Sequence, residues 1–298
     1  MQDVFSDGRY VLSWGDDVRM IHYVQEEDAE KTCLQLPDSI ICFILRGRKW
    51  LYHPGGKVTV APGEGFFAAR GNYLRTERLA EGPLGYVSLV IRLSDVFLAS
   101  LDRLGDQEDA SPGPVCLLRQ DALLNTLVGQ LAGYFQTPGE KARVESILPF
   151  KIRELLTLLA SVPANRGFGT LLRQGPLTLA DPLHALMEAH FRESLSLEQW
   201  AFLAGLSRSS FKRKFETAYN MPPGRWIQQR RLKEAYALLE DRRLNVTEVC
   251  YEIGFENLAH FVHAFKEHYG VTPKQRQLGE PQTIVFGPQA KPMPEPLR

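Results

Sequence analysis

Cysteine is scarce in this sequence, and its four residues are scattered at Cys33, Cys42, Cys116 and Cys250. No two of them form the C-x-x-C pair that usually holds a structural zinc ion. We therefore expect reduced thiols and no structural metal site.

Long apolar runs are also missing. No stretch of about 18 apolar residues occurs, so the sequence predicts no membrane-spanning helix. The first residues include acids and lack the apolar segment of a signal peptide. We expect a cytoplasmic protein without a membrane partner.

Patterns that carry catalysis are absent as well. The histidines of the first 110 residues are His22 and His53 alone, and they do not form an H-x-H pair. The sequence has neither a nucleophile elbow nor a glycine-rich phosphate loop. We predict no catalytic residues, no metal and no cofactor, and hence no enzyme.

The charge is balanced overall but unevenly distributed. Hydrophobic residues make up 44% and charged residues 23% of the 298 residues, which suits an ordinary globular protein of two domains. Residues 207–243 hold ten Lys and Arg against four Asp and Glu. Such a basic segment favours contact with phosphates, although a solvated helix face is the alternative.

Residues 1–110 are predicted to be mostly strand. Short segments rich in β-branched and aromatic residues alternate with Gly, Pro and Asn turns, as in sandwiches and barrels. The expected strands are 18–24, 39–46, 49–52, 57–60, 73–78 and 86–91.

Two amphipathic helices are predicted after these strands, at 121–135 and 144–159. The apolar stripe of the second includes Leu155 and Leu159. This stripe could pack on the strands or join two copies of the chain, and we predict a homodimer through this helix.

A repeated pattern dominates residues 197–277. Gly205 and Gly254 mark two turns, each followed by aromatic residues at four-residue steps. Ser207 and Asn257 are suited to cap the second helix of each copy. The repeat predicts two helix-turn-helix units, with second helices at Arg208–Tyr219 and Leu258–Tyr269. A helical bundle whose aromatic residues only fill the core is the alternative.

Residues 181–277 resemble the DNA-binding domain of the AraC/XylS family of bacterial transcription regulators. The residues that carry the resemblance are Ser196-Leu197-Glu198, Gly205-Leu206-Ser207, Arg231-Leu232, Ala235, Leu238-Leu239, Ile253-Gly254-Phe255, Phe261, Phe265-Lys266, Tyr269-Gly270 and Thr272-Pro273. Asn220, Cys250 and His263 depart from the usual residues of the family, and the last departure puts base contact at that position in question.

The front part is similar to domains that often precede this module. Residues 60–67 resemble the turn and strand of a cupin-like jelly roll. Residues 148–156, together with 61–64, look like the subgroup that activates type III secretion genes. In that subgroup the front domain can be controlled by protein partners.

The sequence thus predicts an α+β protein of two domains. A cupin-like β jelly roll with a helical pair, a regulatory and dimerisation domain, is expected at 1–162, and a linker at 163–178. An all-α domain with two helix-turn-helix units is expected at 179–278, and a proline-rich disordered tail at 279–298.

The resemblance implies a sequence-specific transcription regulator, an activator, controlled through its front domain. The expected partners are double-stranded DNA, RNA polymerase, a second copy of the chain, and an effector that is either a small molecule or a protein. The residues expected to contact DNA are Arg208, Ser209, Ser210, Lys212, Arg213, Leu258, Ala259, His260, His263 and Lys266.

Two enzymes remain as alternatives from another class. One is a cupin-type metalloenzyme fused to a DNA-binding module. The other is a DNA-repair methyltransferase that shares this C-terminal domain. The latter requires a cysteine cluster around zinc, which Cys33 and Cys42 do not supply.

Overall fold

The apolar run at 40–45 forms the centre of strand β4 (Ser39–Arg46), which is buried on both faces. Ile41 and Phe43 belong to one apolar core, whereas Ile40, Cys42 and Ile44 belong to another. Successive side chains of a strand point to opposite faces. A run without polar alternation therefore becomes a strand covered on both sides.

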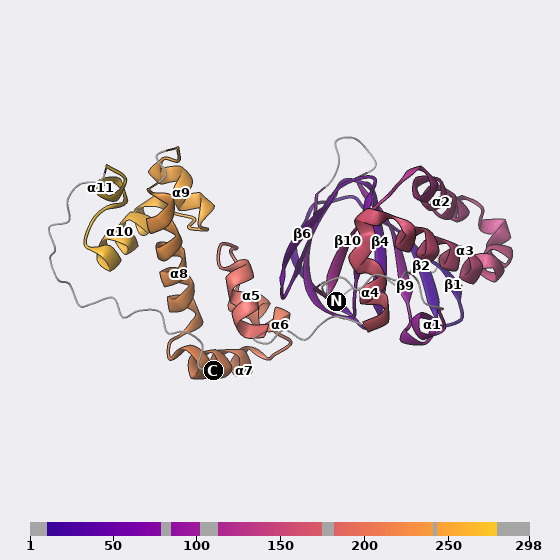
Figure 1. Cartoon of the computed structure of the whole chain (residues 1–298), viewed down its shortest axis with the longest axis horizontal. Coiled ribbons are helices and arrows are strands. Elements are labelled where there is room, and N and C mark those ends of the chain that lie inside the picture. The colour runs from indigo at the N-terminus through magenta and orange to yellow at the C-terminus, as the bar shows by residue number, and fades with distance from the viewer. Residues whose placement is uncertain (1–10, 79–84, 102–112, 175–181, 241–242, 279–298) are drawn as a thin grey trace. The chain divides into compact units, whose positions relative to one another are not determined.

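The computed structural model describes residues 11–78, 85–101, 113–174, 182–240 and 243–278 (Figure 1). It divides the chain into two units, Met1–Ala180 and Asp181–Arg298. The described part of the first unit has two antiparallel sheets. One has the order β1 (Val11–Trp14), β2 (Val18–Gln25), β9 (Tyr86–Leu93), β4, β7 (Glu64–Ala68) and β10 (Val115–Arg119). The other has the order β3 (Ala29–Leu36), β8 (Gly71–Arg78), β5 (Arg48–His53) and β6 (Gly56–Val60).

Helices cover the outer face of the larger sheet (Figure 1). They are α1 (Asp95–Ala99), α2 (Ala122–Gly133), α3 (Lys141–Ser161) and α4 (Arg166–Gln174). Their apolar residues share a core with β1, β2, β4 and β9, while the second core lies between the two sheets. The six predicted strands are all present, but β1, β3, β10 and α1 were not predicted.

The apolar stripe of α3 faces its own domain. Leu155 and Leu159 are each 0% exposed and lie in the core beneath the sheet. They are therefore not available to join two chains, and a dimer contact through these side chains is wrong. The exposed apolar residues of α3 are Ile147 and Phe150.

The segment expected to be a linker is largely part of the first unit. A 3-10 turn (Pro163–Asn165) and α4 pack against α3 and β10, and Phe168 and Leu171 are buried in the helix-covered core. The Asn165 amide donates to the carbonyl oxygens of Arg119 and Leu159. Apolar residues at helical spacing thus outweigh the glycines that suggested a linker. Residues 175–178 and the predicted tail lie outside the described residues.

The described part of the second unit is entirely helical (Figure 1). Its helices are α5 (Pro182–His190), α6 (Leu197–Leu203), α7 (Arg208–Tyr219), α8 (Pro223–Leu238), α9 (Val246–Glu252), α10 (Leu258–Tyr269) and α11 (Pro273–Leu278). The predicted order, a β-rich domain followed by an all-α domain, is confirmed. Among the described residues, no helix is both long and apolar enough to cross a membrane.

Candidate nucleic-acid interface

Two helix-turn-helix units repeat the same backbone geometry. Gly205 and Gly254 take φ values of 68° and 86° in the turns, a conformation that suits glycine. In the first turn the Leu206 N–H donates to the Ala201 carbonyl at 2.9 Å. In the second turn the Phe255 N–H donates to the Cys250 carbonyl at 3.0 Å.

Matched caps fix where the helices of each unit begin. Ser196 with Gln199 forms a capping box at α6, and Asn245 with Glu248 forms another at α9. The side chains of Ser207 and Asn257 accept backbone N–H groups at the starts of α7 and α10. The second helix of each unit therefore begins at the predicted residue.

Aromatic residues at four-residue steps line the buried sides of α7 and α10, the second helices of the two helix-turn-helix units. We call each such row an aromatic ladder. Phe211, Phe215 and Tyr219 are buried along α7; the first two rings are tilted against each other, and the last two are stacked. The corresponding ladder on α10 is Phe261, Phe265 and Tyr269. Burial, with a smaller effect of Tyr236, raises the pKa of Tyr269 to about 12, so this phenol is neutral at physiological pH. These rings position the helices and leave the opposite faces to solvent.

The exposed face of α7 carries the predicted DNA contacts. Ser209, Lys212 and Arg213 are exposed. The guanidinium of Arg208 lies 2.8 Å from the Glu198 carboxylate, but both side chains are more than half exposed. Such surface pairs contribute little and leave the cation available to a phosphate.

Ser210 is less available, because its hydroxyl lies 2.9 Å from that of Ser207. It also lines a hollow of ≈ 700 Å³ beside α7, together with Leu206, Arg213, Lys214, Thr217 and Ala218. Arg213 therefore stands at the edge between this hollow and the exposed face of the helix.

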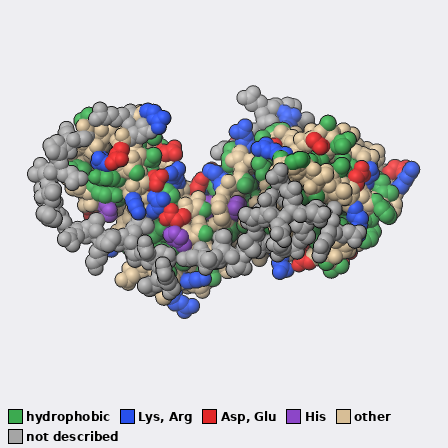
Figure 2. Space-filling view, in the orientation of Figure 1, with side chains coloured by type: hydrophobic (Ala, Val, Ile, Leu, Met, Phe, Trp, Pro, Cys, Tyr) green, Lys and Arg blue, Asp and Glu red, His purple; other side chains and the backbone are tan. Residues whose placement is uncertain are grey.

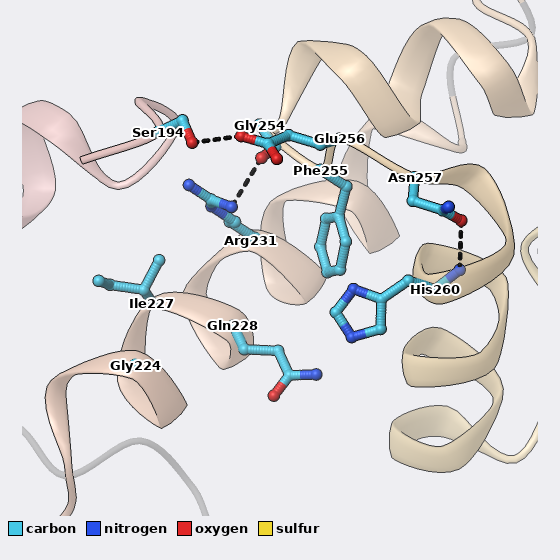
Figure 3. Close-up of a pocket in the computed structure, with 10 residues that line it drawn as sticks. All are labelled: Ser194, Gly224, Ile227, Gln228, Arg231, Gly254, Phe255, Glu256, Asn257 and His260. Carbon is cyan, nitrogen blue, oxygen red and sulfur yellow. Dashed lines mark hydrogen bonds between the residues drawn. The ribbon is translucent and has the colours of Figure 1, made fainter. Parts of the chain in front are cut away.

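The exposed face of α10 is less basic. Ala259, His263 and Lys266 are exposed, and His263 Nδ1 lies 3.8 Å from Glu267. Leu258 is half-buried and packs against the core of the second unit. The ring of His260 lies 5.4 Å from that of Phe255 and faces a pocket beside α8 (Figure 3). Four of the five predicted side chains of α10 are thus exposed, and His260 is one of them although it lies beside the pocket.

Not every basic residue of the segment 207–243 faces solvent. Arg230 pairs with Glu188 and Glu234, and Arg231 donates to three backbone carbonyls. On the face of the second unit seen in Figure 2, basic and acidic side chains are intermingled. The basic excess therefore serves the helix packing as well as the surface.

The pocket beside α8 has a volume of ≈ 430 Å³ and was not predicted. Figure 3 shows Ile227, Gln228 and Arg231 of α8 on one side and Phe255 and His260 on the other. Arg231 appears in the motif of the family, but its carbonyl partners are distant in the sequence. Only the folded backbone brings them together.

The histidines of the first unit have structural surroundings. The His22 ring lies against that of Phe135 in a tilted arrangement, with ring centroids 5.6 Å apart, and burial lowers the pKa of His22. The buried His53 accepts the Gly55 N–H at 3.2 Å through Nδ1. In the described ranges, no cluster of three or more His, Cys, Asp or Glu side chains could hold a metal ion.

Comparisons with known proteins cover both units. A helix-turn-helix domain matches residues 200–277, and the ExsA N-terminal regulatory domain matches residues 39–171. The regulator ExsA of Pseudomonas aeruginosa is 24% identical over 221 residues, which are 74% of this chain and 79% of that protein. The virulence regulon transcriptional activator VirF of Yersinia enterocolitica is 27% identical over 173 residues, 58% of this chain and 62% of that protein.

Solved structures show a weaker similarity. A structure of ToxT from Vibrio cholerae has a TM-score of 0.37 at 11% identity, covering 88% of this chain and 98% of that one. The front-domain match confirms the resemblance to the type III secretion activators. The two matched domains and the twin units lead to one conclusion: the chain is a DNA-binding transcription regulator of the AraC family.

Proposed function

We propose that the chain is a sequence-specific transcription activator whose helices α7 and α10 enter successive major grooves on one side of DNA. The observation that carries the proposal is the pair of matched units, with the same caps, turns and aromatic supports. Successive grooves on one face repeat at about 34 Å. The connecting helix α8 has 16 residues and is therefore about 24 Å long, which together with a helix diameter of about 10 Å suits this repeat.

Contacts with DNA bases are proposed for exposed side chains of both helices. On α7 these are Ser209, Lys212 and Arg213, with Arg208 directed to phosphate. On α10 they are Ala259 and His263, with Lys266 directed to phosphate. Three predicted contacts are placed at the edges of these surfaces. Ser210 is hydrogen-bonded to Ser207, Leu258 is half-buried, and His260 is turned toward the pocket.

The N-terminal domain, residues 1–180, is proposed to form a homodimer and to receive the regulatory signal. Ile147 and Phe150 lie three residues apart on α3, and Phe150 is 72% exposed. Exposed apolar groups of this kind mark contact surfaces. Activation implies contact with RNA polymerase, and relatives such as VirF are named as activators. The signal is either a small ligand or a protein partner.

The experiment is selection of binding sites from random duplex DNA by the full-length protein. Two base-specific half-sites, separated by about one helical turn, are the expected result. Binding without any preferred sequence at about 0.15 M salt would contradict the proposal, because phosphate contacts alone give sequence-independent binding.

A further inference from the structure

The two helix-turn-helix units meet at a close backbone contact. The segment 191–194, between α5 and α6, runs past the turn of the second helix-turn-helix unit at Gly254. A Cβ atom on Gly254 would lie 2.0 Å from the Arg192 carbonyl oxygen, closer than any real contact allows. Glycine is therefore needed here both for its φ of 86° and for the approach of the neighbouring backbone.

One side chain bridges the two backbones at this contact. The guanidinium of Arg231 donates from Nε to the Phe191 carbonyl at 2.6 Å and from one terminal nitrogen to the Glu193 carbonyl at 3.0 Å. Its other terminal nitrogen donates to the Gly254 carbonyl at 2.6 Å (Figure 3). A planar fork with five N–H groups can satisfy several acceptors at once, which the single ammonium of lysine cannot do in this geometry.

The segment 191–194 is directly connected to the first helix-turn-helix unit. It joins α5 to α6, which is the first helix of that helix-turn-helix unit. His190 at the end of α5 packs edge-on against Trp200 of α6. His184 of α5 lies 3.1 Å from the Tyr219 hydroxyl at the end of α7. A displacement of the segment would therefore be transmitted to the first recognition helix.

Other contacts at this junction are more exposed. Arg192 pairs with Glu234 and lies 3.5 Å from Glu252, and the Ser194 hydroxyl bonds to Glu256. Arg192 and Glu252 are each about half exposed, so water screens their attraction. Burial lowers the pKa of Arg231, but a guanidinium remains charged at any physiological pH. The half-buried Arg231 is thus the strongest polar link between the two helix-turn-helix units.

We infer that Arg231 is a positioning residue that fixes the separation of the two recognition helices, so that the protein tolerates only one spacing between its DNA half-sites. This inference rests on the proposed function. Helix α8 sets the length of the connection, and each helix-turn-helix unit packs on it through its own aromatic residues. The bridge from Arg231 to both backbones limits rocking of one unit against the other.

The test measures binding of the full-length protein to its selected operator with the spacer shortened or lengthened by one base pair. Each step shifts one half-site by 3.4 Å, and the wild type is expected to lose roughly tenfold in affinity. Arg231→Gln and the milder Arg231→Lys should flatten this dependence while keeping the same preferred bases in each half-site. Lys233→Gln, an exposed change on the same helix, is the matched control and should behave as the wild type.

Each outcome decides the inference. A wild-type spacing profile in the folded Arg231 variants would overturn it. Unfolding of both variants would overturn it too, because a general core role would then explain the residue. Failure of the wild type to select any two-part operator would instead refute the proposed function, and this result is seen before any variant is made.

Discussion

Asn220 and Gly270 occupy equivalent positions and adopt the same left-handed backbone conformation, with φ values of 51° and 74°. Each ends the second helix of a helix-turn-helix unit, and its N–H donates to the carbonyl four residues earlier, at 2.9 Å and 2.8 Å. Among the described residues, Asn220 is the only non-glycine with a positive φ. Asparagine tolerates this conformation better than most residues, so it replaces glycine without loss of the cap.

This relationship predicts the effect of two substitutions at Asn220. Asn220→Ala should lower the free energy of unfolding by about 1 kcal/mol, because alanine is strained at positive φ. Asn220→Gly should change it by less than about 0.5 kcal/mol. Urea unfolding of both variants provides the measurement. Equal destabilisation by the two changes would show that the Asn220 side chain, and not its backbone, supports the cap.

The helical unit could be predicted closely because its signals are local. Ser207 and Asn257 cap α7 and α10 through neighbouring N–H groups, and Gly205 and Gly254 mark the turns. The predicted bounds of both helices therefore agree with the structure. The role of Arg231 could not be predicted, because its acceptors are carbonyls 23 to 40 residues away.

The front domain was less predictable because its packing is long-range. Strand β10 pairs with β7, about 50 residues earlier, so the neighbouring sequence does not indicate its partner. The stripe of α3 correctly predicted a helix, but a stripe alone does not reveal what covers it. Only the fold shows that Leu155 faces the sheet and that Phe150 faces solvent.

Phe150 and Leu155 should therefore respond differently to a charge. Phe150→Glu should yield a monomer with a free energy of unfolding within about 0.5 kcal/mol of the wild type, as for other surface changes. Leu155→Glu should cost at least about 3 kcal/mol, since it buries an unpaired carboxylate. Sedimentation gives the mass, and urea unfolding gives the stability. An unchanged dimer mass for Phe150→Glu would exclude this part of α3 as the interface.

The second core contains an ion pair between Lys49 and Glu77, with Nζ and Oε1 2.6 Å apart and both side chains at most 5% exposed. Glu77→Gln should lower the free energy of unfolding by about 3–5 kcal/mol, because it leaves the Lys49 ammonium buried without its partner. The double change of Lys49→Met with Glu77→Leu should cost less than Glu77→Gln alone. Arg70→Gln, in an ion pair that is more than 60% exposed, is the control and should cost less than about 1 kcal/mol.

The same pair predicts a dependence on pH. Burial raises the pKa of Glu77, but Lys49 and Arg75 lower it by more, so that the net pKa lies below the ordinary 4.5. A lowered pKa in the folded state means that the stabilisation is complete above 4.5 and is lost as the pH falls through the folded value. The difference in unfolding free energy between wild type and Glu77→Gln should thus shrink below that pH. A constant difference from neutral to acidic pH would show that Glu77 is not ionised in the fold.

The two half-sites should be read unequally. Arg213 on α7 can form a bidentate contact with guanine, which contributes about 1–3 kcal/mol of discrimination. The exposed face of α10 offers instead Ala259, His260 and His263, whose contacts with base edges are weaker. Residues 244–278 also hold three Lys and Arg against four Glu, so phosphate attraction there is limited. The first half-site should therefore carry most of the base information, and the second should mainly position the protein.

Variants of these helices test the asymmetry. Arg213→Ala should relax the preference at one base pair by about 10-fold to 100-fold, and Arg213→Lys should relax it similarly while retaining phosphate attraction. His263→Ala should change any preference by less than about threefold, equivalent to about 0.7 kcal/mol. Binding to an operator with every base pair substituted in turn gives the measurement. Penalties as large in the half contacted by α10 as in the half contacted by α7 would contradict the assignment, because Ala259 and His263 lack the paired donors that such discrimination requires.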